Sequence, residues 1–89
     1  MPQVVVPPPY RGSTLGEARI PADGSTLREC FEDVGRRYPG FIEQIFDGGG
    51  KVHKFVDVFV NGEEIDREDV DSGVAAEDCI EVLAAVAGG

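Results

Sequence analysis

The chain has 89 residues, of which 42% are hydrophobic and 28% are charged, and its formal net charge at pH 7 is −9. A chain this short cannot divide its apolar side chains between two cores, so one small domain is expected. The negative charge and the eight scattered Lys and Arg residues argue against binding to nucleic acids or anionic membranes. Acidic residues concentrate between Asp57 and Glu81, where Arg67 is the only base, and such a segment suits a basic protein partner.

No feature of the sequence points to export or to a metal site. Cys30 and Cys79 are too few for a disulfide scaffold or a zinc site, and they favour a reducing compartment. The segment from Met1 to Pro7 has no basic residue, and its apolar run is too short for a signal peptide or a membrane span. We therefore expect a cytoplasmic protein without a bound metal.

Two short strands are expected at the N-terminus. Gln3 to Val6 is rich in β-branched residues and ends at three consecutive prolines, which cannot donate hydrogen bonds to a sheet. Leu15 to Ile20 alternates between apolar and polar residues, as a second strand would. The two segments predict a hairpin with a long turn from Pro7 to Thr14.

One amphipathic helix is predicted next. Thr26 followed by Glu29 fits a capping box at its start, and Pro39-Gly40 ends it. Apolar residues then recur on one helical face, at Leu27, Cys30, Phe31, Val34 and Tyr38. Cys30 lies on this stripe, so we interpret it as a small core residue and not as a reactive thiol.

The second half of the chain predicts three further strands. Phe41 to Phe46 is compatible with one more helical turn, and Asp47 to Gly50 is interpreted as a flexible spacer. The expected strands are Lys51 to Val60, Glu63 to Ile65 after an Asn61-Gly62 turn, and a last one around Ile80 and Val82. This order, with one helix to cover one face of one sheet, predicts an α+β roll over residues 1–83 and a flexible tail over residues 84–89.

Catalytic constellations are not evident in this sequence. His53 is the only histidine and lies between Lys51 and Lys54, which is typical of a solvated residue. The tail is more informative, because Gly88 and Gly89 lack side chains and would let an extended backbone enter a narrow channel. A carboxylate at its end becomes reactive only after conversion to an acyl adenylate, which requires ATP and a separate enzyme.

Two segments of the chain resemble a known family. Lys51 to Glu63, with the sequence KVHKFVDVFVNGE, and Leu83 to Gly89, with the sequence LAAVAGG, resemble the ThiS/MoaD group of sulfur carriers. The ending and the KVHKFV segment are most similar to the CysO-like carriers of cysteine biosynthesis. Many members of the group have prolines where this chain has Ala84 and Ala85, so its tail departs from theirs.

The resemblance implies a ubiquitin-like β-grasp fold with a mixed sheet and one main helix on one face. It implies that the Gly89 carboxylate is adenylated by an E1-like, ATP-dependent enzyme, converted to a thiocarboxylate and used as a sulfur donor. For cysteine biosynthesis, the implied partners are a synthase that uses pyridoxal phosphate (PLP) and a zinc metallopeptidase. The chain itself would be no enzyme and would hold no cofactor.

Several alternatives remain open at the level of sequence. Sulfur could be donated to molybdopterin, to the thiazole of thiamine, or to thiosugars and other specialised metabolites. The protein could instead be a modifier that joins Gly89 to lysines, or a β-grasp interaction module without a reactive end.

Partner contacts are predicted at two places. Alternation that buries Val56, Val58 and Val60 would point Phe55 and Phe59 outward, where we expect them to dock a partner enzyme. The alternative is that the loop from Gly48 to Lys54 covers them. Val86 and Ala87 are expected to contact the partner along with Gly88 and Gly89.

Overall fold

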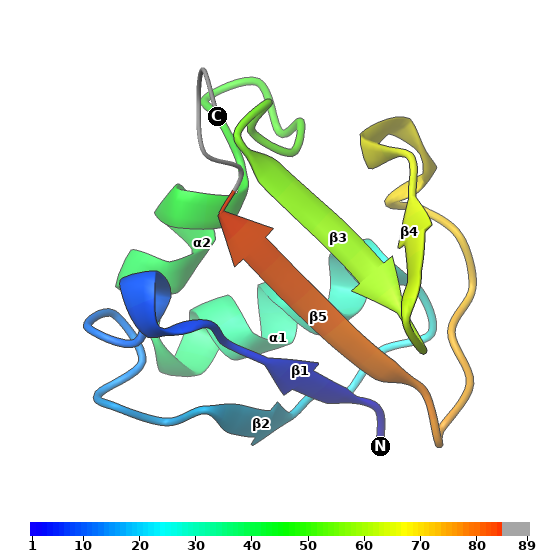
Figure 1. The fold of residues 1–89 in the computed structure, drawn as a ribbon, viewed down its shortest axis with the longest axis horizontal. Coiled ribbons are helices and arrows are strands. Elements are labelled where there is room, and N and C mark those ends of the chain that lie inside the picture. The colour runs from blue at the N-terminus through cyan, green and yellow to red at the C-terminus, as the bar shows by residue number, and fades with distance from the viewer. Residues whose placement is uncertain (85–89) are drawn as a thin grey trace.

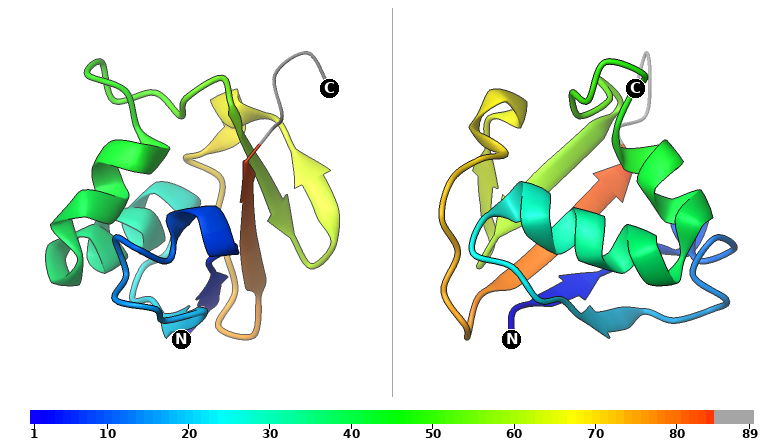
Figure 2. Two further views of the ribbon diagram at one scale, coloured as in Figure 1. Left: turned by 60° about the vertical axis from the view of Figure 1, so that its left-hand side comes forward. Right: turned by 180° about the vertical axis from the view of Figure 1, so that it is seen from behind.

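The structure is a computed structural model that describes residues 1–84. It contains one five-stranded mixed sheet with the strand order β2-β1-β5-β3-β4 (Figure 1). The strands are β1 (Gln3–Val5), β2 (Arg19–Pro21), β3 (Val56–Val60), β4 (Glu63–Ile65) and β5 (Cys79–Ala84). Two helices, α1 (Leu27–Arg37) and α2 (Pro39–Ile45), lie on the same side of this sheet (Figure 2). The predicted α+β roll is therefore confirmed.

The first and last of these strands meet in the middle of the sheet. β1 is antiparallel to β2 and parallel to β5, whereas β3 is antiparallel to both of its neighbours, β4 and β5. The core fills the space between the sheet and the helices. Its largest fully buried side chains are those of Phe31, Phe41, Leu27, Ile45 and Ile80.

The start of α1 follows the predicted capping pattern with one difference. The backbone N–H of Glu29 donates to Thr26 Oγ1 at 3.1 Å, as in a capping box. The Glu29 carboxylate, however, accepts from the N–H of Ser25 at 2.7 Å, one residue earlier than the box requires. The apolar stripe faces the sheet, and Leu27, Cys30, Phe31 and Val34 are buried.

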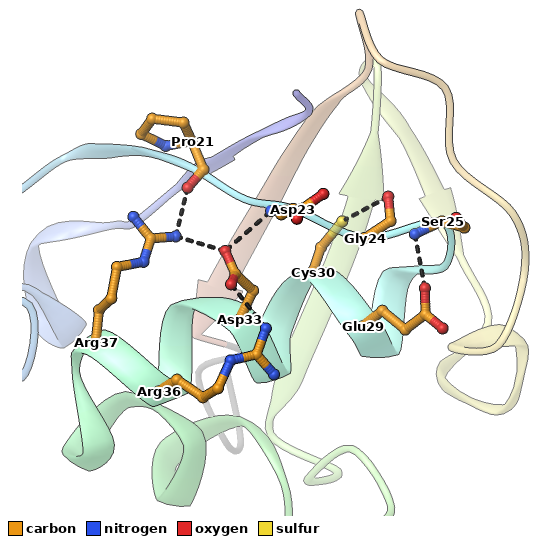
Figure 3. Close-up of polar contacts among 9 residues, drawn as sticks. All are labelled: Pro21, Asp23, Gly24, Ser25, Glu29, Cys30, Asp33, Arg36 and Arg37. Atoms are coloured by element: carbon orange, nitrogen blue, oxygen red, sulfur yellow. Dashed lines mark hydrogen bonds and ion pairs between the residues drawn. The ribbon is translucent and has the colours of Figure 1, made fainter.

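The Asp33 side chain joins α1 to the segment that precedes it (Figure 3). Its carboxylate accepts from the N–H of Asp23 and from both Arg36 and Arg37, at 2.8–2.9 Å. The bond from Asp23 and the two guanidinium groups lower the pKa of this carboxyl. Nearby, Cys30 is fully buried, and burial raises the pKa of its thiol to about 11. The expected core role of Cys30 is thus confirmed.

A second helix is present where one further helical turn was expected. Pro39 is separated from α1 by Tyr38 alone, but it occupies the first turn of α2, where its missing N–H leaves no bond unmade. The helices cross closely at Gly35, because a Cβ atom there would lie 2.8 Å from the Cβ of Ile42. Two helices, not one, therefore cover the sheet.

Two predicted strands begin later than expected. Leu15 lies in a turn with a φ of 55° and is 84% exposed, so β2 starts at Arg19. The segment from Lys51 to Phe55 is also outside a strand, since Asp47 Oδ1 accepts from the N–H groups of Gly49 and Lys51 and holds a tight loop. The predicted Asn61-Gly62 turn is confirmed, with positive φ angles of 53° and 86°. Within residues 1–84, no helix is long and apolar enough to cross a membrane.

Candidate functional site

The described part of the C-terminal segment ends with the last residue of β5, next to the start of β3. Ala84, the last residue of β5, pairs with Val56, the first residue of β3. The predicted acyl-carrying end, Gly88 and Gly89, lies outside the described residues, as do Val86 and Ala87. What the structure establishes is that a central, doubly paired strand leads to this end of the chain.

The sheet face opposite the helices carries the predicted aromatic position Phe59. Val56 and Val58 are 1% exposed and point into the core, so Phe59 points to the open face. Phe59 lies between Glu81 on β5 and Glu64 on β4. Leu83, which is 42% exposed, is paired with Asp57 and is therefore diagonal to Phe59.

Phe55 is in the turn before β3 and not within the strand. It is nevertheless 49% exposed, and Lys54 Nζ lies 5.1 Å from the centroid of its ring. The loop from Gly48 to Lys54 therefore leaves Phe55 open to solvent, although Lys54 itself lies over the ring. We name Phe55, Phe59 and Leu83 the apolar patch.

An open depression adjoins residues 51–54, and no local motif in the sequence indicates it. Its volume is about 710 Å³, and its basic lining residues are Arg28, Lys51, His53, Lys54 and Arg67. These residues are up to 39 positions apart in the sequence, from Arg28 to Arg67, so only the tertiary structure brings them together. We name this depression the basic pocket.

The described residues include few groups suited to metal binding or sulfur chemistry. Within residues 1–84, no group of three or more His, Cys, Asp and Glu side chains is arranged to hold a metal ion. Cys79 is half-buried at the far end of β5 from Ala84, and its N–H donates to Asn61 Oδ1. Cys79 and Ala84 are thus the first and last residues of the same strand.

Comparison with known proteins gives the family. The model of the ThiS family matches residues 9–89. The sulfur carrier protein CysO of Mycobacterium tuberculosis strain H37Rv is 34% identical over 89 residues, which cover 97% of this chain and 96% of that protein.

Solved structures agree with this assignment. The crystal structure of Mycobacterium tuberculosis CysO has a TM-score of 0.87 and 30% identity, and the match covers 97% of this chain and 100% of the other. The Amycolatopsis orientalis BexX/CysO complex gives a TM-score of 0.86 at 34% identity and full coverage of both chains. The small archaeal modifier protein 1 of Methanosarcina acetivorans has a TM-score of 0.84 at 21% identity and covers 99% of this chain and 95% of that one. The last likeness concerns the fold alone, and it supports the β-grasp architecture.

The family match spans the tail and every strand of the sheet except β1, and both CysO matches extend over nearly the whole chain. The chain belongs to the ThiS family of sulfur carriers, which are substrates of partner enzymes and are not enzymes themselves.

Proposed function

We propose that this protein carries sulfur for cysteine biosynthesis as a thiocarboxylate on Gly89. The observation that supports this most directly is the full-length similarity to the CysO of Mycobacterium tuberculosis, together with the Gly88-Gly89 ending. In this proposal the domain that partners recognise extends to Ala84, one residue further than predicted because Ala84 is paired in β5, and residues 85–89 form the arm that enters their active sites.

Loading of the carrier takes two steps, both catalysed by a partner. An oxygen of the Gly89 carboxylate attacks the α-phosphorus of ATP, and pyrophosphate leaves. A sulfur nucleophile then attacks the acyl carbon, AMP leaves, and the chain ends in a thiocarboxylate. ATP belongs to the E1-like activating enzyme, while pyridoxal phosphate and zinc belong to the later cysteine synthase and peptidase.

This chain contributes an arm that is long and narrow enough to enter the active site of a partner enzyme. Fully extended, the five residues 85–89 span at most about 17 Å, which lets a partner keep its reacting groups well away from the sheet. Gly88 and Gly89 have no side chains to exclude them from a narrow channel, and Val86 and Ala87 would contact its entrance. β5 anchors the arm, because it is paired with β3 up to Ala84 and with β1 as far as Glu81.

The chain end is tested by two variants, one with an alanine added after Gly89 and one without Gly89. Reacting atoms must approach to about 3–3.5 Å, and one residue of extended chain is about 3.3 Å, so both variants should lose sulfur loading by a factor of about 100 or more. Loading is measured as the intact-mass change of an oxygen-to-sulfur exchange after incubation with ATP, a sulfide source and the activating enzyme. Both variants should melt like the wild type, since neither alters the described domain.

An added alanine that leaves sulfur loading at the full rate, without prior removal by a peptidase, contradicts the assignment of Gly89. Unchanged loading after loss of Gly89 has the same meaning.

Docking through the apolar patch is part of the proposal. An exposed Phe55 and a half-buried Phe59 fit a hydrophobic contact with the activating enzyme, with Phe59 central and Phe55 nearer the arm. Phe59→Ala should weaken binding to that enzyme about tenfold or more by calorimetry, whereas Arg19→Ala at the other edge of the open face should change it little. Intact binding by a folded Phe59→Ala variant rejects this docking surface.

A second acceptor deserves the same test, because the Amycolatopsis orientalis structure pairs a CysO with BexX. Sulfur-loaded protein can be offered to a cysteine synthase and to a BexX-like enzyme in parallel. Preferential transfer to the latter would make this chain a donor for other sulfur-containing products. Covalent adducts on lysines in cell extracts would instead identify a protein modifier.

A further inference from the structure

Three cationic side chains differ from all the others in the described structure. Arg11, Arg19, Arg28, Arg36 and Arg37 each donate a hydrogen bond to a backbone or side-chain oxygen. Within residues 1–84, the side chains of Lys51, Lys54 and Arg67 have no hydrogen bond and no ion pair. All three line the basic pocket.

The chain has enough acidic side chains to form ion pairs with these three cations. The chain has 17 acidic residues and eight Lys and Arg, so an arrangement that paired every cation was available. Two carboxylates, Asp47 and Glu68, do line the pocket. Asp47 is occupied by the backbone N–H groups of Gly49 and Lys51, and these bonds lower the pKa of its carboxyl.

Arg28, another basic residue of the pocket, supports its shape. Arg28 donates to Asp71 Oδ1 at 2.7 Å and to the Gly50 carbonyl at 2.8 Å, and its guanidinium lies 5.4 Å from the centroid of the Phe46 ring. Val52 and Val70 are buried beneath the pocket. Arg28 thus stabilises the walls of the pocket. Lys51, Lys54 and Arg67 are exposed and have no ion pair or hydrogen bond within residues 1–84, although Lys54 lies over the Phe55 ring.

The pocket adjoins the exit of the arm. Lys54 is two residues before Val56, and Val56 is paired with Ala84. Figure 1 shows the loop between α2 and β3 beside the end of β5. The end of β5 is therefore close to Lys54, a lining residue of this pocket.

We propose that the basic pocket binds the carboxylates of an acidic segment on the enzyme that receives the arm. This inference rests on the proposed function, and it names the chemistry of the partner surface. The pocket is open, and its three free cations are on flexible side chains, which suits several side-chain carboxylates better than one small anion. Elsewhere the carrier is strongly acidic, so a partner with basic surroundings and one acidic projection would dock in a single orientation.

The pocket itself is tested on the isolated protein by NMR titration with hexaglutamate and, separately, with inorganic phosphate at low ionic strength. Hexaglutamate should shift the amide signals of residues 47–54 and 67–70, and the Lys51→Glu/Lys54→Glu variant should lose these shifts. No shift at these residues, or phosphate binding tighter than hexaglutamate binding, overturns the proposal.

The role in docking is tested with the activating enzyme and a control of equal charge. Lys51→Glu/Lys54→Glu and Arg19→Glu/Arg36→Glu both take the net charge from −9 to −13, but only the first alters the pocket. The first should reduce the association rate about tenfold or more and flatten its salt dependence, while the second should have a much smaller effect. Equal losses in the two variants overturn the proposal.

Failure of the proposed function gives a different pattern. An activating enzyme that never loads wild-type protein with sulfur refutes the carrier role, while the titration still decides whether the pocket binds carboxylates.

Discussion

The two faces of the sheet differ in what their side chains do. On the covered face, Val4, Ile20, Val58, Ile80 and Val82 are at most 2% exposed and pack against the helices. On the open face, one row runs across all five strands as Arg19, Val5, Glu81, Phe59 and Glu64. The covered face is chemically uniform because it maintains the fold, whereas the open face mixes charges with an aromatic ring and is free to meet partners.

The largest expected difference between the covered face and the open face comes from replacing one phenylalanine on each side of the sheet by alanine. Phe31 is fully buried and contacts the rings of Phe41 and Phe46, so Phe31→Ala should lower the free energy of unfolding by about 3–5 kcal/mol. Phe59→Ala removes a half-buried ring and should cost about 1 kcal/mol. Urea denaturation of both variants measures the difference. Equal costs would show that the open face is part of the core.

A smaller effect is expected at the helix crossing that covers the sheet. Alanine usually stabilises a helix over glycine by about 1 kcal/mol. At Gly35, however, the new methyl group would lie 2.8 Å from Ile42 Cβ, so Gly35→Ala should be net destabilising by about 1–3 kcal/mol. The double variant Gly35→Ala/Ile42→Ala relieves this clash and should recover part of the loss. A more stable Gly35→Ala single variant would mean that the helices separate at little cost.

The reactivity of the two cysteines compares the two faces of the sheet without any substitution. Cys79 is half-buried on the open face and should react with iodoacetamide in the native protein. Cys30 should react only in denaturant, because it is buried and its thiol pKa is about 11. Intact mass should show one adduct under native conditions and two in urea. Two native adducts would indicate that α1 opens readily.

Ionisation of Cys30 should make the free energy of unfolding depend on pH, whereas that of Cys79 should not. Its folded pKa of about 11 lies above the ordinary value of 9.0, so the unfolded state loses the proton first as pH rises. The neutral buried thiol contributes fully to the free energy of unfolding below pH 9, and this contribution is lost between pH 9 and 11. Cys30→Ala should remove this part of the alkaline decline in the free energy of unfolding, while Cys79→Ala should not.

Local signals in the sequence were sufficient for the elements that depend on local physics. Thr26 and Glu29 predict the start of α1 because capping involves adjacent backbone, and Asn61-Gly62 predicts its turn because both residues tolerate positive φ. The same alternation that predicts β3 also places Phe59 on the open face.

Two of the features that the sequence did not predict depend on local hydrogen bonds from or to a side chain, and a third depends on contacts between distant residues. Leu15 continues an alternating pattern, yet buried Thr14 donates to the Glu17 carbonyl at 2.9 Å and turns the chain away from a strand. Lys51 to Phe55 looks like strand, but the Asp47 carboxylate closes the preceding loop. The basic pocket was invisible because Arg67 approaches Lys51 only after β3 and β4 have formed.

The parallel pairing of β1 with β5 has a consequence for synthesis. Gln3 pairs with Cys79 and Val5 with Glu81, so the centre of the sheet joins residues separated by 76 positions. Contacts of such long range make folding late on the ribosome, because β1 must wait for β5 to emerge. A nascent chain that stops before Cys79 leaves β1 and β3 without the strand between them. The domain can therefore fold and resist proteases only after β5 has been translated. A chain without β5 stays unfolded and is open to proteolysis.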